Sequence, residues 1–129
     1  MPTYDTTHSE PPAPLAQVVL RHINTGAVRS NVPMLLDSGA DVTLVPQVVI
    51  SELGITPVPD RQYELVGFDG NASLAPVVQL ELVFYRRTFR GQFLLIDQEW
   101  GILGRNVLNT ISLLFDGPNL SWNEHRPGD

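Results

Sequence analysis

The sequence contains no cysteine, which excludes disulfide bonds, thiolate metal sites and a cysteine nucleophile. It also contains no apolar run that approaches the ~18 residues of a membrane-spanning helix. Residues 1–5 lack the basic start and apolar core of a secretory signal peptide. From these absences we expect a cytoplasmic protein with no membrane partner.

Basic residues are few compared with acidic ones, since 8 Lys and Arg accompany 14 Asp and Glu, for a net charge of −6. A nucleic-acid surface requires clustered positive charge. The nearest cluster comprises Arg86, Arg87 and Arg90, and a hairpin turn explains it. We therefore expect no nucleic-acid partner.

The three histidines, at positions 8, 22 and 125, are scattered along the chain. Their spacing fits no metal-binding motif. The sequence thus predicts no metal site, and no organic cofactor is implied either.

Short apolar segments separated by turn sequences indicate an all-β fold. The 129 residues suit one domain, and 43% of them are hydrophobic. In residues 78–84, apolar side chains alternate with other residues, as in a strand with one buried face. Turn residues at 24–26 and 116–119 divide further apolar segments. Two short helices are expected, one after Pro46 and one over residues 105–109.

The chain divides into three predicted parts. Residues 1–14 hold four prolines and are expected to form a flexible Pro-rich arm. Residues 15–124 form the predicted domain, and residues 125–129 form a C-terminal tail.

Two sequence blocks carry candidate chemistry. In residues 34–41, Met-Leu-Leu-Asp-Ser-Gly-Ala-Asp, an apolar run leads a carboxylate into a turn. An ordinary turn is the alternative interpretation, because Asp and Ser bond nearby backbone and Gly accepts a positive φ. The second block is Gly-Ile-Leu-Gly-Arg-Asn-Val-Leu, at residues 101–108. The segment between the blocks has room for two hairpins.

Together these blocks resemble the two halves of a retropepsin-like aspartic protease subunit. The resemblance implies a closed β-barrel, the acid protease fold, that is active as a two-fold homodimer. Asp37 would be catalytic and would meet Asp37 of a second copy. The implied activity is aspartic endopeptidase cleavage of extended peptide or protein substrates with apolar side chains. The competing interpretation of Asp37 is a turn carboxylate satisfied by its own loop.

The resemblance also implies roles for the residues around Asp37. Ser38 would fix the carboxylate geometry, and Gly39 would let the backbone approach the substrate. Ala40 stands where pepsin-like enzymes often carry a hydroxyl. Gly39 and Asp41 would bind substrate backbone, and Asp41 would pair with Arg105 to support the dimer. Solvated charges are the alternative for this last pair.

A glycine-rich hairpin tip at residues 67–71 would form the flap over the substrate. Gly67 and Gly70 permit sharp turns, and Phe68 could cover the bound peptide. A plain surface hairpin is the alternative. Trp100 and Ile102 match positions that line substrate pockets, although Trp100 could equally be a core residue.

The same fold could serve a different class of function. A non-catalytic retropepsin-like module for dimerisation or peptide binding would keep the barrel without cleaving anything. A third possibility is a heterodimer in which another chain supplies the second aspartate.

Overall fold

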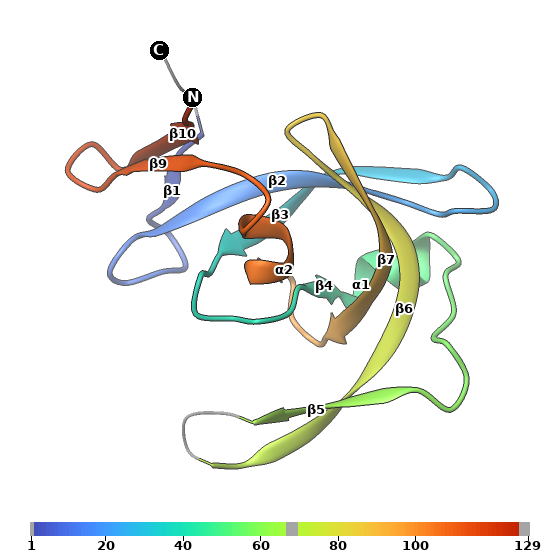
Figure 1. Cartoon of the computed structure of the whole chain (residues 1–129). Helices are drawn as coiled ribbons and strands as arrows, with labels where there is room; N and C mark the ends of the chain where they lie inside the picture. Colours follow the sequence, from blue (N-terminus) through green and yellow to red (C-terminus); the bar gives the residue numbers. More distant parts are fainter. Residues whose placement is uncertain (1, 67–69, 127–129) are drawn as a thin grey trace.

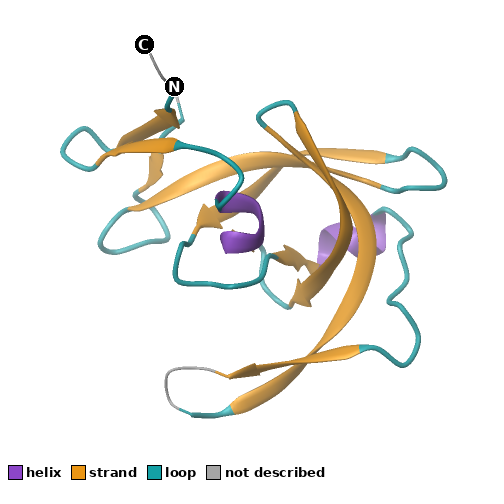
Figure 2. Cartoon of the chain, in the orientation of Figure 1, coloured by secondary structure: helices purple, strands orange, loops and turns teal. Residues whose placement is uncertain are grey.

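The computed structural model describes residues 2–66 and 70–126, and within them backbone pairing forms ten strands and two short helices. The elements are β1 Tyr4–Asp5, β2 Ala13–Arg21, β3 Val28–Leu36, β4 Leu44–Pro46, α1 Gln47–Glu52, β5 Gln62–Val66, β6 Ala72–Phe84, β7 Arg87–Ile96, β8 Gly101–Leu103, α2 Arg105–Leu108, β9 Leu113–Asp116 and β10 Ser121–Glu124. Figure 2 shows how strongly strands predominate over helices.

Eight of the strands form one sheet that closes on itself. Their order is β1-β2-β3-β8-β4-β7-β6-β5, and an additional pairing between β2 and β6 joins distant parts of that sheet. Figure 1 shows β6 and β7 as long, strongly curved strands that run side by side. Closure protects the backbone hydrogen-bonding groups that an open sheet would leave at its edges. The predicted all-β closed barrel with two short helices is confirmed.

The predicted helices lie where the sequence signals placed them. α1 begins directly after Pro46, and Gly54 follows its end with φ of +72° while its N–H donates to the Ser51 carbonyl oxygen at 3.0 Å. A positive φ suits glycine, which has no Cβ to clash with the backbone. α2 starts at Arg105, immediately after Gly104, which is the residue that follows β8.

Strand β6 contributes to two apolar clusters because its side chains alternate between faces. Val78, Leu80, Leu82 and Phe84 belong to the main core. Ala75 and Val77 face a smaller cluster that includes Leu44 and Leu94. The predicted alternation over residues 78–84 is confirmed, and the strand extends further toward the N-terminus, to Ala72.

Strand β8 brings the second sequence block beside the first. It lies parallel to β3, with Leu36 opposite Leu103, and Leu44 of β4 pairs with Ile102 from the other side. A Cβ at Gly101 would collide with the Leu44 carbonyl oxygen and the Met34 side chain. Glycine at this position therefore permits the close approach of the three strands.

The proline-rich N-terminal segment contacts the rest of the chain. Tyr4 of β1 pairs with Pro14 of β2, and the Pro2 carbonyl oxygen accepts a hydrogen bond from the Trp122 N–H at 3.1 Å. Strand β2 starts at Ala13, two residues before the predicted start of the domain. The division into arm, domain and tail stays a prediction.

Strands β9 and β10 form a separate two-stranded hairpin near both ends of the described chain (Figure 1). Trp122 anchors it, with 2% of its surface exposed and its indole N–H donating to the Leu15 carbonyl oxygen at 2.9 Å. Leu114 and Phe115 on the same hairpin are 59% and 48% exposed. In the part of the chain that the structure describes, neither helix has the length and apolar character to cross a membrane.

Candidate active site

The loop that follows β3 presents the Asp37 carboxylate at the surface. The Asp37 N–H donates to the Leu103 carbonyl oxygen at 3.0 Å, which attaches the start of the loop to β8. The Asp37 carbonyl oxygen accepts the Ala40 N–H at 3.1 Å, and Oδ1 accepts the Gly39 N–H at 2.9 Å. The carboxylate is thereby oriented while remaining exposed.

Gly39 suits the tight geometry of this turn. A Cβ on Gly39 would lie 3.1 Å from Asp37 Oδ1, closer than an ordinary contact. A larger residue would therefore press on the carboxylate that the loop orients.

A buried threonine connects the two sequence blocks. The Gly104 N–H donates to Thr43 Oγ1 at 3.0 Å, and Thr43 Oγ1 donates to Asn106 Oδ1 at 2.6 Å. Thr43 is 1% exposed. Because a buried hydroxyl is costly unless it is hydrogen-bonded, this pair of bonds holds the second block against the segment after Asp37.

Gly104 fits into a space that would not admit a side chain. A Cβ there would collide with the Val42 carbonyl group and would come within 3.0 Å of the Ala40 carbonyl oxygen. Because Gly104 has no side chain, the start of α2 can lie close to the Asp37 loop. The next residue, Arg105, can then reach two carbonyl groups of that loop.

Arg105 binds the Asp37 loop at two points. Its backbone N–H donates to the Ala40 carbonyl oxygen at 2.8 Å, and its guanidinium donates to the Ser38 carbonyl oxygen at 2.8 Å. Within the described residues, no ion pair joins Arg105 to Asp41. The contribution of Asp41 and Arg105 to a dimer stays a prediction.

The sequence reasoning identified Asp37, Ser38 and Arg105 but missed the role of Thr43 in positioning the loop. The available signal was a hydroxyl residue between Val42 and Leu44 in an otherwise apolar segment. That signal became interpretable only once Asn106 was known to lie within hydrogen-bonding distance.

The two predicted pocket residues, Trp100 and Ile102, flank Gly101 in the sequence and have different surroundings. Ile102 of β8 packs against the smaller apolar cluster, beside Leu44. Trp100 is partly buried and makes an edge-on ring contact with His8, with the ring centroids 4.6 Å apart. Neither contact tests substrate binding.

The β5–β6 hairpin stands where the flap was expected. Strands β5 and β6 pair from Gln62 opposite Pro76 to Val66 opposite Ala72, and Figure 1 shows the hairpin projecting from the barrel. Gly70 has φ of +81°. The predicted flap residues Gly67 and Phe68 lie outside the described residues.

A cavity of about 420 Å³ lies between this hairpin and the barrel, and its mostly apolar lining also includes Gln47, Ser73 and Asp97. Leu65, Leu74 and Ala75 line it from the hairpin, and Leu44 and Ile96 line it from the barrel. Its walls suit apolar side chains of an extended chain.

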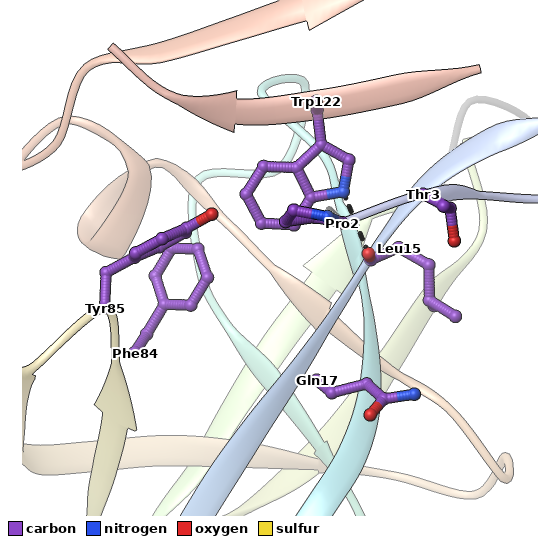
Figure 3. Close-up of a pocket in the computed structure, with 7 residues that line it drawn as sticks. All are labelled: Pro2, Thr3, Leu15, Gln17, Phe84, Tyr85 and Trp122. Atoms are coloured by element: carbon purple, nitrogen blue, oxygen red, sulfur yellow. Dashed lines mark hydrogen bonds between the residues drawn. The ribbon is translucent and has the colours of Figure 1, made fainter. Parts of the chain in front are cut away.

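Another cavity, of about 450 Å³, lies away from these residues (Figure 3). Trp122 and Tyr85 meet edge-on at one side, and burial raises the pKa of Tyr85. The side chains that line it are those of Pro2, Thr3, Leu15, Gln17, Phe84, Tyr85 and Trp122. None of these described residues is a carboxylate or an imidazole.

Comparison with known proteins supports the assignment of the fold. A solved structure titled "EIAV protease complexed with the inhibitor HBY-793" aligns with a TM-score of 0.56 at 20% sequence identity, over 82% of this chain and 91% of that chain. No protein-family model and no curated protein matches the chain. The chain therefore has a retropepsin-like fold.

Proposed function

We propose that the chain is one subunit of a homodimeric aspartic endopeptidase. The observation that carries the proposal is the exposed Asp37 carboxylate, held in a loop that Leu103 and Arg105 fix through the backbone. Rigid support of an accessible carboxylate is what a general acid–base group needs. The retropepsin-like fold agrees with this chemistry.

The proposed reaction uses two copies of Asp37 that share one proton. The ionised carboxylate takes a proton from water, whose oxygen attacks the carbonyl carbon of the peptide, while the protonated carboxyl donates to the carbonyl oxygen. A C–O bond forms first. The C–N bond then breaks as the carboxyl that took the proton of water gives it to the leaving nitrogen. The other carboxylate takes back the proton from the diol hydroxyl, so the pair again holds one proton.

The homodimer is proposed because each chain has one Asp-Ser-Gly motif. An apolar cavity of about 380 Å³ adjoins Ser38 and includes Leu108, Ile111 and Phe115 in its lining. Phe115 lies on the β9–β10 hairpin, and so does the exposed Leu114. A second copy covering this surface would bring its own loop toward Asp37.

The proposed substrates are extended peptides with apolar side chains. The cavity beside the β5–β6 hairpin provides an apolar wall, and Ile102 packs in the same cluster. Gly39 and Asp41 would bind the peptide backbone, and Trp100 would border a pocket. In this scheme Ser38 orients the carboxylate, and Ala40 adds no hydroxyl to it.

The direct test is Asp37→Asn, assayed with a peptide library and mass-spectrometric detection of cleavage. Asparagine is nearly isosteric, so the circular dichroism spectrum should match that of wild type. Turnover should fall by roughly 10²–10⁴-fold, the usual contribution of an acid–base group. Equal turnover in the two proteins would overturn the proposal.

The alternative is a non-catalytic peptide-binding module. The hydrogen bond from the Gly39 N–H to Asp37 Oδ1 favours it, because that bond alone would satisfy a turn carboxylate. Binding of library peptides by the wild type, with no cleavage at any pH, would support this alternative.

A further inference from the structure

A histidine from the N-terminal segment contacts the predicted pocket residue Trp100. The ring centroids of His8 and Trp100 lie 4.6 Å apart, with an interplanar angle of 69°. Aromatic pairs favour such edge-on geometry because the ring edge is positive and the ring face is negative. The two residues are far apart in sequence, so the contact joins the β1–β2 loop to the segment that enters β8.

Asp5 fixes the backbone of this histidine. The Asp5 carboxylate accepts the N–H of His8 at 2.9 Å and that of Thr7 at 3.2 Å. The His8 Nδ1 atom lies 3.7 Å from Asp5 Oδ1. The Asp5 side chain is 8% exposed and that of His8 is 62% exposed, so the imidazole can exchange protons with water while its backbone is held.

The other charged side chains of residues 5–10 and 97–100 are all acidic. The loop of His8 carries Glu10, and the segment that ends in Trp100 carries Asp97 and Glu99. Asp5 is the one of these groups with an ion-pair contact to His8 among the described residues. A protonated imidazole binds an indole more strongly than the neutral ring does.

On the basis of this contact we infer that His8 is a positioning residue for Trp100, and that its protonation sets how firmly the indole borders the pocket. The inference rests on the proposed function only where substrate selectivity is concerned. A protonated His8 contacts the indole more strongly and keeps the predicted pocket narrow. Deprotonation weakens the contact, and the pocket then accepts larger apolar side chains.

The effect of His8 on the Trp100 indole can be tested without an activity assay, by NMR of the intact chain. The sequence has 2 tryptophans, so two indole N–H signals are expected, and Trp100→Phe identifies that of Trp100. The Trp100 signal should shift between acid and neutral pH if protonation of a histidine alters the contact. The Trp122 indole, which donates to the Leu15 carbonyl oxygen, serves as an internal control.

Two variants show whether His8 causes the shift. His8→Phe keeps an aromatic ring and should abolish the pH-dependent movement of the Trp100 signal. Asp5→Asn weakens the carboxylate contact that holds the His8 backbone and should reduce that movement. A Trp100 signal that titrates in His8→Phe as it does in wild type would overturn the inference, as would a signal that does not respond to pH in wild type.

Selectivity is then measured as the ratio of kcat/KM for two peptides that carry Phe or Ala at the same position. In wild type the Phe:Ala ratio should rise by about two- to fivefold from acid to neutral pH, the change expected for losing an exposed cation–π contact. In His8→Phe it should stay constant. An identical pH response in both proteins contradicts the role in selectivity. Loss of the NMR response in His8→Phe without cleavage of any peptide would instead contradict the proposed function.

Discussion

Thr43 Oγ1 donates a hydrogen bond to Asn106 Oδ1 at 2.6 Å, and the two residues are 63 positions apart in the chain. The same oxygen accepts the Gly104 N–H. This one hydroxyl therefore joins the segment after Asp37 to the beginning of α2, and α2 in turn supplies Arg105 to the Asp37 loop.

Thr43→Val should destabilise the protein by about 1–3 kcal/mol, because it leaves the Gly104 N–H and the side-chain Oδ1 of Asn106 without the buried hydroxyl that bonds them. Thr43→Ser is the matched control, since it keeps the hydroxyl and loses one methyl group, a cost of about 0.8 kcal/mol. Urea unfolding of the three proteins measures the difference. A serine variant as unstable as the valine variant would refute the role of the hydroxyl.

Gly104→Ala should displace the Asp37 loop, because the added methyl would collide with the Val42 carbonyl group. Forced backbone shifts of this kind cost about 1–3 kcal/mol. Gly91→Ala is the control, since nothing lies within 4 Å of a Cβ at that position. Thermal unfolding should distinguish the two variants, and equal melting temperatures would contradict the close packing at Gly104.

Gly70→Ala should slow peptide cleavage if the hairpin acts as a flap. Gly70 has φ of +81°, a conformation that costs an alanine about 1–2 kcal/mol. The effect on kcat/KM should reach up to about tenfold. Gly70→Asn is the control, because asparagine tolerates positive φ better than alanine does. Unchanged kinetics in the alanine variant would show that the conformation at Gly70 does not limit turnover.

Acid should destabilise the protein partly through Asp5. Although burial acts to raise the pKa of this carboxyl, the backbone N–H groups of Thr7 and His8 and the Ser9 side chain lower it overall. A lowered folded-state pKa means that the contribution to stability is present above the ordinary value of 3.8 and is lost as pH falls through the folded-state value. Asp5→Asn should therefore lose less stability than wild type between neutral and acid pH. Parallel pH–stability curves would contradict this.

The proposed role of the β9–β10 hairpin in dimerisation can be tested separately. Phe115→Ser should weaken dimerisation in sedimentation experiments, because this exposed side chain lines the apolar cavity beside Ser38. Val28→Ser is the control, since Val28 is 54% exposed on β3. Equal self-association in the two variants would place the interface elsewhere.

Much of the fold could be predicted from local sequence patterns. The alternation from Val78 to Phe84 identified half of β6, and Pro46 and Gly54 bracketed α1. These signals depend on neighbours in the chain, so the sequence contains them directly. The support of the loop depends instead on contacts between distant residues. Thr43 meeting Asn106 and His8 meeting Trp100 are products of the strand order, which periodicity does not reveal.

In the candidate site, too, local contacts were predictable from the sequence and contacts between distant residues were not. The Asp37 turn was predictable because its hydrogen bond to the Gly39 N–H is local. The expected ion pair of Arg105 with Asp41 came from resemblance, whereas the guanidinium in this chain donates to the Ser38 carbonyl oxygen. A partner for Asp41 in an assembled dimer stays a prediction.

The central claim is that two copies of Asp37 form one site, and subunit mixing tests it most directly. A fixed amount of wild type is incubated with an equal amount of Asp37→Asn until subunits have exchanged, and peptide cleavage is then measured. Random pairing should leave about half of the original activity, because mixed dimers hold one carboxylate where two are needed. Activity that stays unchanged as the variant is added, in a mixture shown to contain mixed dimers, would contradict the shared site.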